Sequence, residues 1–191
     1  MKTLFNDHFY WKFQAPNTED LDDFIWSCNK YDGAPWDDLC SVKTLQIEQD
    51  ILHLLQPSIR KLCEVSGVMM NMKMNRPWVS EYSRGDHQEV HDHNDADLVA
   101  VYFPEYKEGF SKFYFVDRGV NLRRPVMDLM RNSNQHIVDV KAGDVVFFPG
   151  HMLHGVSVHK HDIIRRSLSC NLWITQLTHT QQDGIHSEDD Q

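Results

Sequence analysis

Histidine and aspartate alternate within residues 89–103, EVHDHNDADLVAVYF. His91, His93 and Asp95 are candidate metal ligands, because side chains two residues apart on an extended segment point to the same side. Asp92 points the opposite way on such a segment and is the weakest candidate. The pattern favours a metal site, although a strand that merely turns a polar face to water would also carry two histidines.

A third ligand is expected from residues 147–156, FFPGHMLHGV, which offer His151 and His154. Three protein ligands on one face of a metal leave positions open for substrate and oxygen, as catalysis requires. Both histidines are candidates for that ligand, although His151 is also consistent with a turn residue near the mouth of the site.

Composition limits the classes of partner and compartment. A chain of 191 residues with a net charge of −9 is expected to be a single acidic domain, which argues against nucleic-acid and anionic-membrane partners. No apolar run approaches membrane-spanning length, and no leader pattern opens the chain. The four cysteines form no C-x-x-C pair, so a reducing cytoplasm is the expected location.

The first third of the chain reads as helical. Thr18 is expected to cap a helix whose apolar residues follow at helical spacing, and a second helix is expected from about Lys43. Pro57 would end that helix or begin a new helical turn.

The remainder of the chain is expected to be β-structure. Short strand-like runs separated by turn residues predict a sandwich, barrel or jelly roll. We therefore expect one domain over residues 1–178, with a helical part at about 18–66 and a β core at about 67–178. Residues 179–191 contain almost no apolar side chains and are expected to form a mobile tail.

The spacing of glycine and histidine resembles the cupin, or double-stranded β-helix, superfamily. Its first pattern, glycine, five residues and His-x-His, stands as Gly85, His91 and His93. Its second pattern stands as Gly143, Pro149, Gly150 and His154, with His151 where glycine is usual and Asp97 at the position of a glutamate ligand. The resemblance implies a mainly β jelly roll with N-terminal flanking helices.

A further element resembles the Fe(II)/2-oxoglutarate oxygenases within that superfamily. Arg165 and Ser167 lie eleven and thirteen residues past His154 and match the R-x-S element of that family. There the arginine pairs with the far carboxylate of 2-oxoglutarate, a geometry that suits a planar guanidinium. Tyr82, in YSRGD, matches the Tyr-x-x-Gly whose tyrosine often contacts the co-substrate.

A narrower resemblance, over about residues 76–173, is to a bacterial and phage branch that is similar to prolyl hydroxylases. The order and spacing of its motifs carry the likeness. In this chain they stand as Trp78, Tyr82-Ser83-Arg84-Gly85, His91-Asp92-His93, Val101-Tyr102-Phe103, Gly109, Phe115-Val116-Asp117-Arg118, Phe148-Pro149, His154 and Arg165-Arg166-Ser167-Leu168-Ser169-Cys170-Asn171.

This resemblance implies a 2-oxoglutarate-dependent Fe(II) dioxygenase, a hydroxylase that also consumes O2 and that ascorbate would support. Fe(II) would be held by His91, His93 and His154, and 2-oxoglutarate by Arg165 with Ser167 and Tyr82. Oxidative decarboxylation of 2-oxoglutarate would be coupled to oxidation of a small-molecule or peptidyl substrate. The sequence specifies neither that substrate nor the oligomeric state.

The second ligand has two possible registers. His91-x-His93 fits the spacing from Gly85, whereas His93-Asn94-Asp95 is a literal His-x-Asp of the kind the family at large uses. A carboxylate would partly neutralise Fe(II), which favours Asp95, but the glycine spacing favours His91 with His93. We take His91 with His93 as the leading prediction and keep His93 with Asp95 as its alternative.

Three other classes of function fit part of the pattern. His91-x-His93-x-Asp95 also begins the signature of zinc hydrolases of the metallo-β-lactamase type, but Ala96 stands where their final histidine belongs. A cupin-like metal-binding isomerase or sensor would need the histidines and have no use for Arg165. A jelly roll that has lost catalysis and serves as a binding module is a third possibility.

Several neighbouring residues receive structural interpretations. Trp78 and Tyr102 are equally consistent with packing and with co-substrate contact, because aromatic residues are common in strands. Arg166 alternates with Arg165 and is expected to face solvent, and His159 is expected in a polar loop.

Overall fold

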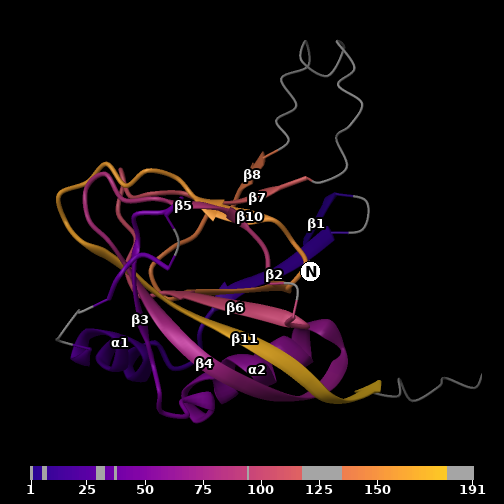
Figure 1. Cartoon of the computed structure of the whole chain (residues 1–191). Helices are drawn as coiled ribbons and strands as arrows, with labels where there is room; N and C mark the ends of the chain where they lie inside the picture. Colours follow the sequence, from indigo (N-terminus) through magenta and orange to yellow (C-terminus); the bar gives the residue numbers. More distant parts are fainter. Residues whose placement is uncertain are drawn as a thin grey trace, which may run out of the picture.

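Two antiparallel sheets and two helices make up the fold in a computed structural model that describes residues 2–5, 8–28, 33–36, 38–93, 95–117 and 135–179 (Figure 1). The larger sheet has the strand order β1-β2-β9-β6-β11-β4-β3, and the smaller one the order β5-β10-β7-β8. The helices are α1 (Thr18–Ser27) and α2 (Leu52–Ser66). The strands are β1 (Lys2–Phe5), β2 (His8–Gln14), β3 (Lys43–Gln46), β4 (Val68–Tyr82), β5 (Gln88–His91), β6 (Leu98–Phe103), β7 (Phe113–Val116), β8 (Gln135–Ile137), β9 (Asp144–Pro149), β10 (His154–Val156) and β11 (Arg165–His179).

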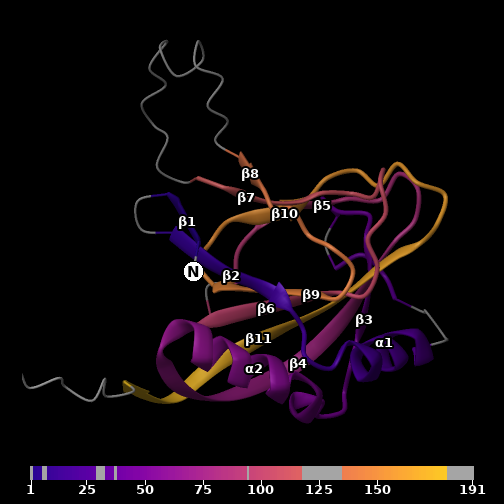
Figure 2. The same cartoon turned by 180° about the vertical axis from the view of Figure 1, so that it is seen from behind.

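The larger sheet separates two cores. Both helices cover one of its faces, and the smaller sheet lies over the other (Figures 1 and 2). Strand β6 is buried along its whole length because its side chains alternate between the cores. Ala100 and Tyr102 face the helices, whereas Val99 and Val101 face the smaller sheet. This layered jelly roll with flanking helices confirms the expected fold class.

Side chains of β11 also alternate between the helix-covered face of the larger sheet and the space between the two sheets. Leu168 and Cys170 lie in the core beneath the helices, while Arg165 and Ser167 face the space between the sheets. The antiparallel register places Arg165 directly opposite Tyr82 at the end of β4. Two positions that lie far apart in the chain are therefore brought together at the open end of the inter-sheet space.

The N-terminal third contains more strand than we expected. Strands β1 and β2 precede the first helix, and β2 extends the larger sheet by pairing with β9. Its sequence, HFYWKFQ, is rich in aromatic residues, which favour strands. Residues 43–46 are also a strand, paired with the end of β4, where we expected the start of a helix.

The helix boundaries differ from the prediction at two points. The N-cap of α1 is Asn17 and not Thr18, and its side-chain amide donates to the carbonyl of Leu54 at 2.9 Å. Pro57 lies inside α2 and neither ends nor begins it. The missing proline N–H removes one helical hydrogen bond, yet the helix continues because Leu55 and Ile59 are buried against the sheet.

Arg166 does not face solvent as expected. Its guanidinium pairs with Glu81 at 2.9 Å and donates to the carbonyl of Ile25 in the last turn of α1. The alternation with Arg165 was predicted correctly, but the opposite face of β11 is covered by α1 and is not open to water. A cation at this place satisfies a terminal helix carbonyl.

The remaining expectations concern the C-terminal tail, membrane-spanning segments and the domain boundaries. Of the tail expected at residues 179–191, His179 belongs to β11 and residues 180–191 lie outside the described part of the chain. Among the described residues, no helix is both long and apolar enough to cross a membrane. The single-domain boundaries at residues 1–178 stay a prediction.

Candidate metal centre

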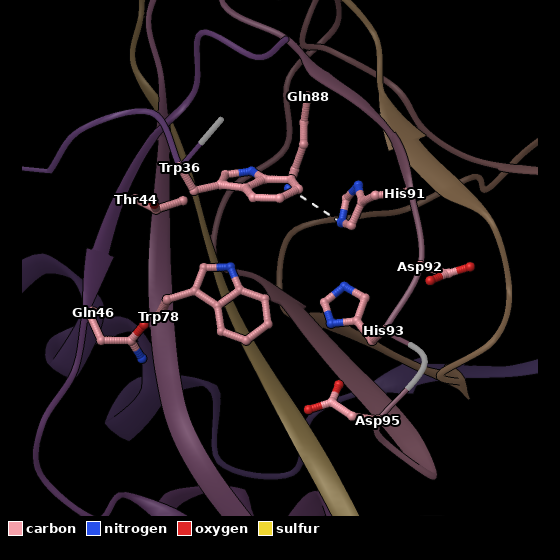
Figure 3. A pocket seen from close by; sticks show the side chains of 9 residues that line it. All are labelled: Trp36, Thr44, Gln46, Trp78, Gln88, His91, Asp92, His93 and Asp95. Carbon is pink, nitrogen blue, oxygen red and sulfur yellow. Dashed lines mark hydrogen bonds between the residues drawn. The ribbon is translucent and has the colours of Figure 1, made fainter. Parts of the chain in front are cut away.

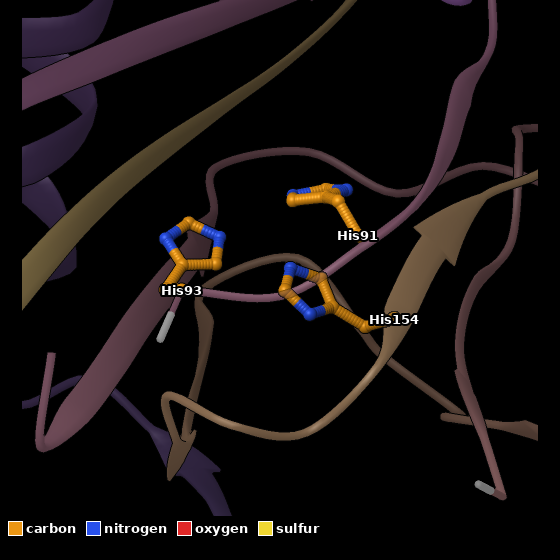
Figure 4. Close-up of side chains that lie close together, drawn as sticks. All are labelled: His91, His93 and His154. Atoms are coloured by element: carbon orange, nitrogen blue, oxygen red, sulfur yellow. The ribbon is translucent and has the colours of Figure 1, made fainter. Parts of the chain in front are cut away.

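Three histidines converge between the two sheets (Figure 4). His91 on β5 and His154 on β10 stand directly opposite each other in the antiparallel register. His93 follows the end of β5, and one ring nitrogen from each of the three residues lies within 4.8 Å of the others. Two metal–nitrogen bonds of about 2.1 Å span at most about 4.2 Å. The three rings can therefore hold one ion after drawing together slightly.

The turn after β9 holds the His93 segment in place. The backbone N–H of His93 donates to the carbonyl of Gly150 at 2.8 Å. A Cβ on Gly150 would lie 2.5 Å from the carbonyl oxygen of His93 and 2.2 Å from that of Ala96, so only glycine permits this approach. The glycine of the FPG turn thus positions a histidine more than fifty residues away in the chain.

Each histidine has an oxygen next to its Nδ1 atom. The partners are the carbonyl of Glu89 for His91 at 2.9 Å and the carbonyl of Met152 for His154 at 2.9 Å. The partner for His93 is the side-chain oxygen of Asn171 at 2.7 Å. Nδ1–H is the donor in all three bonds, which leaves the Nε2 lone pair free to bind a metal.

Burial keeps these imidazoles neutral at physiological pH. It lowers the pKa of His93 to about 4 and the pKa of His91 and His154 below the usual value, and repulsion from neighbouring rings lowers the pKa of His93 and His154 further. Neutral imidazole is the form that ligates metals, so the cluster needs no deprotonation before an ion binds.

Arg165 is a buried cation without a carboxylate partner among the described residues. Its side chain is 1% exposed, its Nη1 donates to the hydroxyl of Ser111 at 3.3 Å, and its Nε has no hydrogen-bond partner. The rings of Tyr82 and Phe103 lie 4.7 and 5.4 Å from the guanidinium carbon. A buried guanidinium without a counterion is costly, so this arrangement fits a site for an anionic ligand.

An inner cavity connects Arg165 with the three histidines. Ser167, Ser169 and Tyr82 line it together with apolar side chains of both sheets. The Tyr82 hydroxyl donates to Gln88 Oε1 at 2.8 Å, and the amide of Gln88 lies 3.4 Å from His91 Nε2. Burial raises the pKa of Tyr82 to about 12, so the phenol stays protonated and donates hydrogen bonds.

An outer cavity of about 490 Å³ opens on the other side of His91 and His93 (Figure 3). Trp36 and Trp78 form its aromatic wall, and Asp95 lies at its edge. The indole of Trp78 stacks on His93 at 5.6 Å with the ring planes 13° apart. The histidines therefore stand between two cavities of opposite character, one ending in a cation and the other edged by carboxylates.

The sequence over residues 76–171 matches the protein family described as "Putative 2OG-Fe(II) oxygenase". The chain belongs to the 2-oxoglutarate- and Fe(II)-dependent oxygenases. It is therefore an enzyme that uses Fe(II), 2-oxoglutarate and O2, as the resemblance implied. The match also decides against a zinc hydrolase and against a cupin without 2-oxoglutarate. No curated protein matches the chain.

Solved structures with the fold of this oxygenase share little sequence with it. HygX from Streptomyces hygroscopicus, with nickel and 2-oxoglutarate bound, is 12% identical, with a TM-score of 0.62 over 90% of this chain and 85% of that one. A Pseudomonas putida prolyl-4-hydroxylase is 16% identical, with a TM-score of 0.55 over 88% and 92% of the two chains. The carbocyclase SnoK from nogalamycin biosynthesis is 17% identical, with a TM-score of 0.63 over 93% and 85%.

The oxygenase brings together the residues singled out by its sequence, with one exception. His91, His93 and His154 form one cluster, and Arg165, Ser167 and Tyr82 line the inner cavity next to it. Asp95 is exposed and lies outside the cluster. The indole of Trp173 donates to the backbone carbonyl of Asp95, which fixes this turn away from the three rings.

Other interpretations of the oxygenase sequence are corrected. The Tyr102 hydroxyl donates to Asp22 of α1 at 2.6 Å on the far face of the sheet, so Tyr102 is a packing residue, whereas Trp78 lines both cavities. His159 lies in the loop between β10 and β11, as expected, but its side chain is fully buried. Its Nδ1 accepts from the backbone N–H of Ser111 at 3.2 Å, so it supports the serine that contacts the guanidinium.

Three contacts of this oxygenase were missed from sequence. Asn171 stands in the motif that begins at Arg165, but its contact with His93 was not predicted. Ser111 and Trp36 gave no local signal. Trp36 reaches the site through an isolated bridge between Ala34 and Thr44, which is tertiary information.

Proposed function

We propose that this oxygenase binds Fe(II) through His91, His93 and His154 and the far carboxylate of 2-oxoglutarate through Arg165, with Ser167 and Tyr82 beside it. It would oxidise a small-molecule or peptidyl substrate that occupies the outer cavity. The observation that supports this most strongly is the position of three neutral imidazoles at the junction of two cavities, with the unpartnered Nε of Arg165 in the inner one.

Side chains of this chain would orient both bound species. Bound Fe(II) with 2-oxoglutarate and O2 supplies the oxidising chemistry. The guanidinium of Arg165 would fix the far end of the co-substrate, and the carbonyls and amide at the Nδ1 atoms would hold the imidazoles in register. Val99, Val101 and Phe113 line the inner cavity and would exclude water from it.

Co-substrate binding would require a local rearrangement. The inner cavity has a volume of about 20 Å³, roughly the space of a single water molecule. A five-carbon dicarboxylate needs more room, so the side chains of Tyr82, Gln88 or Arg165 would shift when it enters. The Gln88 amide, which now lies 3.4 Å from His91 Nε2, would yield that nitrogen to the metal.

Two substitutions test whether His93 or Asp95 is the second metal ligand. We expect His93→Ala to lose most bound iron, because it removes an imidazole from the cluster, and Asp95→Asn to retain iron, because that carboxylate lies outside it. Metal analysis after anaerobic reconstitution with Fe(II) measures both. Iron loss in Asp95→Asn would establish the His93-x-Asp95 register instead, in which His93 is still a ligand and His91→Ala would retain iron.

A screen for stimulated turnover tests the proposed reaction. Small molecules and short peptides are added in turn to iron-loaded protein with 2-oxoglutarate and ascorbate, and succinate is measured. The true substrate is expected to raise succinate release and to gain oxygen or lose hydrogen, which mass spectrometry detects. Stimulation without any change in the added compound would mark that compound as an effector and not the substrate.

A further inference from the structure

The outer cavity has an unusual wall. Figure 3 shows the indoles of Trp36 and Trp78 on one side of it and the imidazoles of His91 and His93 on the other. The remaining lining residues are polar: Thr44, Gln46, Gln88, Asp92 and Asp95. No aliphatic hydrophobic side chain, lysine or arginine is among the described residues that line it.

Two carboxylate side chains, those of Asp92 and Asp95, are among the residues that line this cavity. Asp95 turns its carboxylate toward the indole side, whereas Asp92 points away from the histidines (Figure 3). Glu89 of β5 does not line the cavity, and its two carboxylate oxygens are buried without a hydrogen-bond partner among the described residues. The guanidinium of Arg165 lines the inner cavity and not this one.

Backbone contacts bring the aromatic wall to this place. The bridge between Ala34 and Thr44 carries Trp36 over the cavity, where its ring lies 5.5 Å from that of His91. Gly33 makes the bridge possible, because a Cβ there would lie 2.6 Å from the Thr44 carbonyl oxygen. Trp36 is half exposed, so part of its ring face is open to a ligand.

We propose that the substrate of this oxygenase carries an ammonium or guanidinium group, which Trp36, Trp78 and Asp95 receive in the outer cavity. The proposal rests on the proposed function, since it concerns the substrate of the same centre. Aromatic faces and a nearby carboxylate are the groups that bind organic cations. The carbon chain attached to the cation would then pass His91 and His93, beside the metal.

The same wall disfavours other classes of substrate. A fatty chain needs aliphatic lining, which this cavity does not offer among its described residues. An anionic substrate would meet the carboxylate of Asp95, and no lysine or arginine is among the described residues that line the cavity. A cationic group would be attracted both by the indole rings of Trp36 and Trp78 and by the carboxylate of Asp95. A cationic substrate therefore fits this cavity better than a neutral or an anionic one.

Binding to the inactive Ni(II)–2-oxoglutarate complex tests the proposal without turnover. The probes are N-acetyl-lysine methylamide, its neutral isostere N-acetyl-norleucine methylamide and the free diamine pentane-1,5-diamine, titrated by calorimetry. We expect the lysine probe or the diamine to bind at least about tenfold more tightly than the neutral isostere. Preference for the lysine probe would indicate a peptidyl source of the cation, and preference for the diamine a free molecule.

Two variants test whether the cation binds in the outer cavity. Asp95→Asn is expected to reduce cation affinity about fivefold, and Trp36→Leu by a similar factor, with unchanged iron content and 2-oxoglutarate affinity. Glu108→Gln is the matched control, because it removes an exposed carboxylate that lines none of the described cavities and should change neither affinity.

Three outcomes would overturn the proposal. These are equal binding of the neutral isostere, unchanged cation affinity in Asp95→Asn, and no binding of any probe by protein that still binds 2-oxoglutarate. All three leave the proposed function in place. Failure of the wild-type protein to bind 2-oxoglutarate at all would instead contradict the proposed function, and this inference would fall with it.

Discussion

His154→Ala is expected to lose stable iron binding. His154 is 4% exposed and stands directly opposite His91 in the strand register, so no other described imidazole can take its place. Loss of an outer-shell partner alone costs roughly 10- to 100-fold in metal affinity, and loss of a ligand costs more. Metal analysis after reconstitution with Fe(II) and desalting should find less than about a tenth of the wild-type iron.

His151→Ala provides the matched control for that experiment. His151 is a histidine of the same turn, three residues earlier, and is exposed. Its removal should leave the iron content unchanged. A thermal melt of both variants establishes that each remains folded, since His154 also contacts Phe148 in the inter-sheet core. Full iron content in folded His154→Ala would contradict the assignment of this ligand.

Arg165→Met is expected to weaken 2-oxoglutarate binding by about 100-fold while iron binding stays nearly intact. Truncating one partner of a buried, hydrogen-bonded charge pair has effects of this order. Methionine keeps much of the apolar stem between the rings of Tyr82 and Phe103, so the substitution removes the charge with limited loss of packing. Calorimetric titration of the metal-loaded protein with 2-oxoglutarate gives the affinity.

Two further variants define what the arginine contributes. Arg165→Lys keeps the charge without the planar fork and should recover only part of the affinity. Arg84→Ala removes an exposed arginine that pairs with Asp162 at 2.5 Å and should have no effect. If 2-oxoglutarate bound equally well to Arg165→Met and the wild-type protein, another residue would have to hold the far carboxylate.

Local periodicity accounts for the parts of the site that the sequence predicted. Alternation along extended chain placed His91 with His93 and Arg165 with Ser167, and this needs no knowledge of partners. The apolar run after the histidines became β6, which is buried on both faces. The spacing from Gly85 to His91 and from Gly143 to His154 then indicated that these two distant segments meet.

The remaining contacts depend on what covers each strand, which local periodicity does not encode. Arg166 alternates with Arg165 as expected, but its destination depends on α1, which covers that face of the sheet. Trp36 reaches the outer cavity only through the bridge to Thr44. Pro57 is tolerated inside α2 because burial of neighbouring leucine and isoleucine side chains outweighs one lost hydrogen bond.

Release of succinate without a prime substrate tests the central claim most directly. Wild-type protein is loaded with Fe(II) and supplied with 2-oxoglutarate and ascorbate, and succinate is measured before and after O2 is admitted. Slow, iron-dependent and O2-dependent succinate formation is expected, and it should disappear in His154→Ala. Iron-replete protein that neither binds 2-oxoglutarate nor forms succinate would contradict the assignment of this site as a working oxygenase centre.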